Sequence, residues 1–98
     1  MIVGTTPTHS FSTPCKASDV AKVRVIYSQN DTPILIKTDC TVADNLVSVN
    51  LTQDDTFLFD ATQSVEIQVR ILTKTNVAIA SIPKRVGATK CLENEVIK

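Results

Sequence analysis

The only histidine of the chain, His9, is the side chain whose ordinary pKa would allow proton exchange near neutral pH. A Ser-His-Asp or Cys-His arrangement would have to use it, because a nucleophile needs a base beside it. No cysteine or serine stands in a nucleophile-elbow or protease-type motif, and Thr8 and Ser10 flank His9 with hydroxyl groups. We therefore interpret His9 as a solvent-facing or hydrogen-bonded histidine. The sequence predicts no catalytic residue and no enzyme.

The three cysteines, Cys15, Cys40 and Cys91, are an odd number at wide spacings. This pattern fits neither a full disulfide framework nor a zinc knuckle, so we expect buried or half-buried free thiols. One histidine cannot build a His-rich metal site, and two glycines could hardly supply a glycine-rich phosphate loop. We therefore predict no metal site, no cofactor-binding residue and no cofactor.

Two small charge clusters have ordinary explanations. Asp54 and Asp55 are adjacent, which does not aim two carboxylates at one point, and we expect them to complement the dipole of a short helical turn. Thr52 stands three residues before Asp55, as at the start of a capped helix. The basic residues at 84, 85 and 90 are interpreted as a solvated end of the chain rather than a phosphate site.

The elements that would position these side chains are predicted to be strands. Apolar and polar residues alternate strictly over residues 65–71, which is the period of a half-buried strand. The chain contains 12 valines, 9 isoleucines and 13 threonines, whose branching at Cβ favours extended backbone. Glu66 and Arg70 lie on the predicted outer face of this strand. For both we expect cross-strand pairing with charges on a neighbouring strand.

A second regular strand is predicted over residues 22–28, with Val23, Val25 and Tyr27 on one face and Lys22 and Arg24 on the other. The other expected elements are an edge strand or arm within residues 2–11, a strand at 34–40 that returns as a hairpin, a strand at 47–52, one helical turn at 53–56, and a strand at 77–82. With few glycines, the turns should use residues that tolerate left-handed backbone: Asn30, Asp31, Asp44, Asn45 and Asn76.

Six or seven short strands, with turns every 8 to 12 residues, predict two antiparallel sheets packed face to face. The expected fold is all-β, a single immunoglobulin-like antiparallel β-sandwich with one short helical turn; a small barrel is the competing architecture. Leu58 and Phe59 could close one end of the core. We expect one domain over residues 1–98, with residues 1–13 as an N-terminal arm or edge strand and residues 84–98 as a C-terminal tail.

Composition argues against several classes of function. Ten basic and ten acidic side chains cancel, so no net field attracts nucleic acid. No window approaches the roughly 18 apolar residues of a membrane-spanning helix. The start of the chain has no signal-peptide pattern, so we expect synthesis and folding in a cytoplasm. Three phenylalanines, one tyrosine and no tryptophan offer few platforms for stacking sugars or bases.

Five segments carry a resemblance to a family: residues 4–11, 22–30, 51–56, 65–73 and 91–97. With them the chain resembles small structural proteins of tailed phages and prophages of Firmicutes over nearly its whole length. It is also similar, at the level of pattern, to the sandwich domain that begins the upper baseplate proteins of lactococcal siphophages. The family supplies no catalytic residues, so no site is carried over from it.

The resemblance implies a virion structural or assembly protein, associated with the tail or baseplate and acting through protein–protein contacts. The partners it implies are other phage structural proteins and further copies in a homo-oligomer, with no nucleic acid and no membrane. The location it implies is the virion, assembled in the cytoplasm of the bacterial host. Two alternatives stay open: a displayed binding module for a host surface receptor or polymer, and a head decoration protein.

Overall fold

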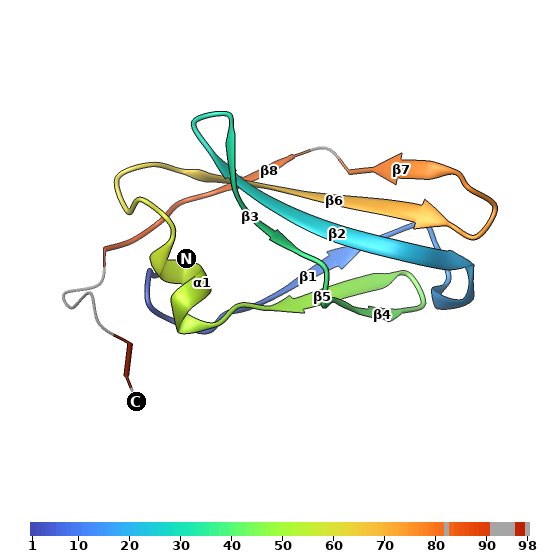
Figure 1. The fold of residues 1–98 in the computed structure, drawn as a ribbon, viewed down its shortest axis with the longest axis horizontal. Helices are drawn as coiled ribbons and strands as arrows, with labels where there is room; N and C mark the ends of the chain where they lie inside the picture. Colours follow the sequence, from blue (N-terminus) through green and yellow to red (C-terminus); the bar gives the residue numbers. More distant parts are fainter. Residues whose placement is uncertain (82, 91–95, 98) are drawn as a thin grey trace.

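The computed structural model describes residues 1–81, 83–90 and 96–97. Within these residues eight strands form two antiparallel sheets, where six or seven strands were expected (Figure 1). The smaller sheet has the order β1-β5-β4, and the larger has the order β3-β2-β6-β7 with β8 also paired to β6. The strands are β1 (Thr8–Ser12), β2 (Val20–Gln29), β3 (Thr32–Lys37), β4 (Thr41–Ala43), β5 (Leu46–Asn50), β6 (Val65–Thr73), β7 (Ala78–Ala80) and β8 (Lys84–Val86).

The expected all-β fold is confirmed as an antiparallel β-sandwich. The core lies between the sheets and is filled by alternate residues of β2, β5 and β6: Val23, Val25, Tyr27, Val47, Val49, Val65, Ile67, Val69 and Ile71. The intervening residues of these strands face outward, because side chains alternate across a pleated strand. In Figure 1, β2 and β6 run side by side along the length of the molecule.

Left-handed backbone makes the turns, as the sequence predicts. Asn30, Asp31, Asn45 and Asn76 all have positive φ angles, of 50°, 61°, 61° and 65°. The strands predicted at 22–28 and 34–40 approach each other more closely than expected, since β2 continues to Gln29 and β3 begins at Thr32. Two successive left-handed residues match the twist of paired strands, so the hairpin closes with a two-residue turn.

The short helix α1 (Gln53–Phe57) is one residue longer than the turn expected at 53–56. Thr52 Oγ1 accepts a hydrogen bond from the Asp55 N–H, and Asp55 Oδ2 accepts one from the Thr52 N–H, which completes a capping box. Phe59 is buried in the core, but Leu58 is 54 % exposed, so the expectation for Leu58 is wrong. Leu58 forms the C-cap of α1, whereas the ring of Phe59 lies 5.7 Å from the ring of Tyr27 between centroids.

The two end stretches are held against the sandwich. Residues 8–12 form β1, an edge strand paired with β5, whereas residue 2 forms an isolated bridge with Thr89. Buried Thr56 Oγ1 accepts a hydrogen bond from the Gly4 N–H and donates to the Thr5 carbonyl, so the start of the chain is tied to α1. Lys84–Val86, from the stretch predicted as a tail, forms β8.

Two other boundaries differ from expectation. The strand expected at 34–40 ends at Lys37, and a separate strand, β4, begins at Thr41 in the other sheet. The strand expected at 77–82 covers Ala78–Ala80, and residue 82 lies outside the described residues. A 3-10 turn (Ala17–Asp19) precedes β2. No helix of the described residues is long and apolar enough to cross a membrane.

Candidate interaction site

His9, the candidate base, is hydrogen-bonded to a tyrosine. Its Nδ1 lies 2.7 Å from the hydroxyl of Tyr27, which is fully buried. Burial, together with the positive charge of the N-terminus, lowers the pKa of His9. Burial also raises the pKa of Tyr27, with smaller contributions from Cys40 and Asp55, so the phenol stays protonated and shares a hydrogen bond with the imidazole. This pair links the two sheets, and no thiol or serine hydroxyl bonds the described His9 ring.

The two adjacent aspartates in the first turn of α1, Asp54 and Asp55, have different surroundings. Asp54 is exposed, whereas Asp55 caps α1 and pairs with Lys37 of β3 at 3.0 Å. Burial alone would raise the pKa of Asp55, but the Thr52 backbone N–H and the Lys37 ammonium bring it below its usual value. The exposed fractions of the Lys37 and Asp55 side chains are 13 % and 18 %, so water screens this pair little. The pair fastens β3 to α1.

The two described cysteines, Cys15 and Cys40, form no disulfide. Cys15 is buried and Cys40 half-buried, and both are free, as the sequence predicts. Burial raises the pKa of Cys40, with Asp39 adding to the effect and Lys37 opposing it, so the unreactive thiol form is favoured. Cys91 lies outside the described residues. Among the described residues, no group of three or more His, Cys, Asp or Glu is placed to hold a metal ion.

The outer face of the larger sheet carries an unusual arrangement of cations. Arg24 of β2 lies directly across from Arg70 of β6, and Lys22 lies across from Leu72. None of the three cations forms an ion pair with a described carboxylate. The cross-strand pairing expected for Glu66 is present, with Arg85 of β8 at 3.0 Å.

The cross-strand charge pairing expected for Arg70 is wrong, because the register of β2 against β6 places Arg24 directly across from it. We call Lys22, Arg24 and Arg70 the basic face.

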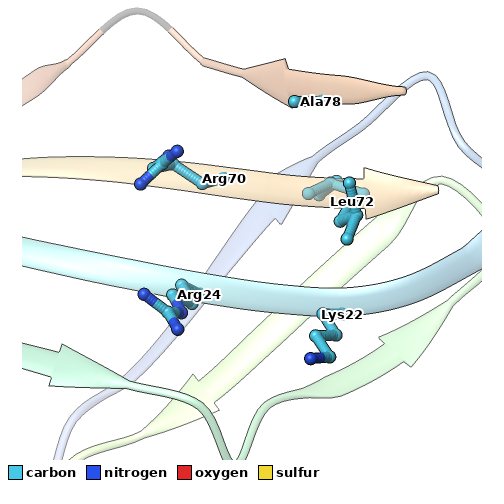
Figure 2. Close-up of a pocket in the computed structure, with 6 residues that line it drawn as sticks. Lys22, Arg24, Arg70, Leu72 and Ala78 are labelled. Atoms are coloured by element: carbon cyan, nitrogen blue, oxygen red, sulfur yellow. The ribbon is translucent and has the colours of Figure 1, made fainter. Parts of the chain in front are cut away.

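The basic face borders a shallow hollow of about 270 Å³. Figure 2 shows its labelled residues on three neighbouring strands, with Arg24 and Lys22 on β2, Arg70 and Leu72 on β6, and Ala78 on β7. Ala78 lies across from Leu72, and both residues line the hollow. Guanidinium groups present fixed, planar donors, so the hollow suits a carboxylate or another oxyanion.

A second hollow, which we call the side groove, opens beside the first. It has a volume of about 420 Å³ and lies where β3 has left β2 and the chain crosses to β4 in the other sheet. Its lining combines two members of the basic face with apolar and half-buried residues: Ala17, Val20, Ala21, Lys22, Val23, Arg24, Thr38, Cys40 and Val42. The two hollows therefore share Lys22 and Arg24 and form one continuous surface region.

Sequence reasoning placed Lys22, Arg24 and Arg70 on outer faces correctly, but it could not place Arg24 beside Arg70. The two arginines are 46 residues apart in the chain, and their strands pair in a register that no local sequence pattern indicates.

Comparisons with protein-family models, with curated proteins and with solved structures found no match. The chemistry of the site is thus that of its own side chains, a cationic surface beside an apolar groove.

Proposed function

We propose that this protein is a structural or assembly protein of a phage virion, associated with the tail or baseplate, which acts by contacts with other phage structural proteins and with further copies of itself. The resemblance of its five segments to small tailed-phage proteins supplies the context. The structural observation that supports the proposal is the basic face, because its arginines oppose one another without a described counter-charge.

Like charges directly opposite in a sheet are destabilising, so the Arg24 and Arg70 pair opposes the pairing of β2 with β6. A partner surface with carboxylates would offset that cost on binding. Ile36, 49 % exposed, lies across from Ile26, which is two residues from Arg24 along β2 and on the same face. Arginine mixed with exposed apolar side chains is typical of protein interfaces. We therefore infer that this face contacts a protein.

The alternative of a displayed binding module for a host polymer would be favoured by aromatic residues gathered at one loop end. Instead, Tyr27 and Phe59 lie in the core, and the ring of Phe57 covers Gly4. Nucleic acid is disfavoured because the net charge is zero and the basic face contains three cations, whereas binding depends on neutralising several phosphates. These observations favour the structural role over both other classes.

The test is quantitative mass spectrometry of density-purified phage particles from the strain that carries the gene. We expect the protein at a fixed low ratio to the major capsid protein, as for a component of the tail or baseplate. A ratio near that of the capsid protein would support head decoration instead. Absence from the particles, with the protein present in the lysate, would overturn the proposed virion role.

A further inference from the structure

The first half of β2 has an open edge. β3 pairs with β2 only from Val25 to Gln29, so residues 20–24 have no described strand on that side. β4 pairs only with β5 among the described strands, so its other edge is open too. The side groove lies between these two edges. Unpaired strand edges present a row of main-chain donors and acceptors, which natural proteins usually cover.

The side chains around this edge alternate between charged residues on the outer side and apolar residues on the inner side. Lys22 and Arg24 are exposed on the outer side, two residues apart, and Arg70 adds a third cation opposite Arg24. On the inner side Val23 is buried, and Val42 and Cys40 are half-buried walls of the groove. A strand laid beside β2 would therefore meet cations with every second side chain and apolar surface with those between.

We propose that this open edge is a strand-addition site for an extended segment of a partner protein in which carboxylate and apolar side chains alternate. The segment pairs its main chain with residues 20–24 of β2, places its carboxylates over Lys22 and Arg24, and inserts its apolar side chains into the side groove. This inference rests on the proposed function, since it names the chemistry of the protein partner.

A polypeptide fits this edge better than a polyanion. Only a polypeptide offers main-chain donors and acceptors at the spacing of a strand, together with side chains that alternate between its two faces. A polyanion would contact the cations and leave the apolar walls of the groove exposed to water. The side groove is continuous with the basic face, so one bound segment would cover both surfaces.

The test uses the full chain and a synthetic ten-residue peptide that alternates glutamate and valine, with blocked ends and a fluorescent label. Binding is measured by fluorescence anisotropy, and the contact is mapped by NMR shifts of the backbone amides. We expect saturable binding with shifts confined to residues 20–24, 38–42 and 70. The double variant Lys22→Glu with Arg24→Glu should bind at least tenfold more weakly. The matched variant Lys74→Glu, at an exposed turn and in the lining of neither hollow, should bind as the unchanged protein does.

A second peptide of the same sequence, N-methylated throughout, separates strand addition from simple charge attraction. It keeps every carboxylate but has no main-chain donors, so we expect at least a tenfold loss of affinity. Equal binding of both peptides, or shifts elsewhere in the protein, would overturn strand addition. Absence of the protein from phage particles would overturn the virion role without affecting the peptide result, so the two failures are distinguishable.

Discussion

Nδ1 of His9 and the hydroxyl of Tyr27 lie 2.7 Å apart and join β1 of the smaller sheet to β2 of the larger one. The tyrosine ring lies inside the core, and its hydroxyl reaches the partly buried imidazole. A buried polar group is costly when it has no partner, so this bond lets an aromatic side chain fill the core while its polar end is satisfied. The one histidine of the chain thus has a structural task.

Replacing Tyr27 by phenylalanine keeps the ring and removes the hydroxyl. We expect the free energy of unfolding to fall by about 1–2 kcal/mol, because His9 Nδ1 is left partly buried without its partner. Urea unfolding followed by circular dichroism measures this change. The control is Ser10→Ala, which removes an exposed hydroxyl bond to Ser48 and should cost less than about 0.5 kcal/mol. Equal losses in the two variants would contradict the role of the pair.

Stability should depend on pH through His9. Its pKa in the folded protein lies below the ordinary value of 6.5, so the unfolded chain takes up a proton first as the pH falls. The stabilisation is fully present above pH 6.5 and is lost as the pH falls from there through the folded pKa. Urea unfolding at a series of pH values should show this slope, and His9→Gln should flatten it. If the substitution leaves the slope unchanged, the pH dependence of stability arises from titratable groups other than His9.

Breaking the ion pair between β3 and α1 should destabilise the protein. Lys37→Met leaves Asp55 largely buried without its cation, and we expect a loss of about 2 kcal/mol, below the values for fully buried pairs. Asp39 also lies 3.4 Å from the ammonium, but its side chain is 74 % exposed, so Asp39→Asn should change stability by less than about 0.5 kcal/mol. Urea unfolding measures the loss of stability in both variants. Similar losses would contradict the prediction that the buried pair with Asp55 stabilises the protein more than the exposed pair with Asp39.

The two glycines should respond differently to alanine. Gly4 has a φ of +83°, and a Cβ there would meet Phe57 Cζ at 2.7 Å, so Gly4→Ala should cost more than about 1 kcal/mol. A Cβ on Gly87 would meet nothing within 4 Å, and Gly87→Ala should leave stability within about 0.5 kcal/mol. Thermal unfolding of both variants measures the difference. A tolerated alanine at position 4 would contradict the close packing of the N-terminal segment on α1.

The sequence predicts the features that depend on neighbouring residues. Alternation places Val65 to Ile71 correctly in β6, and Asn45 and Asn76 occupy turns because their side chains tolerate left-handed backbone. Thr52 and Asp55, three residues apart, predict the start of α1. Each of these signals lies within a few residues, where side-chain chemistry acts directly on the backbone.

The features that sequence reasoning missed depend on strand pairing. Arg24 meets Arg70, and Lys37 meets Asp55, only after strands and helix have packed. β4, three residues long, is too short to show a period and exists through its pairing with β5. The candidate site is therefore visible in the sequence as separate cations, and its assembly into one basic face beside a groove is a property of the fold.

The most direct test of the account is whether the basic face is needed for incorporation into phage particles. A strain lacking the gene would be supplied with the unchanged protein, with the double variant Arg24→Glu and Arg70→Glu, or with the exposed control Lys74→Glu, and purified particles would be measured by quantitative mass spectrometry. We predict the unchanged protein and the control at one fixed ratio to the capsid protein, and the double variant reduced at least tenfold although it is folded in the lysate. Equal incorporation of all three proteins would contradict the account.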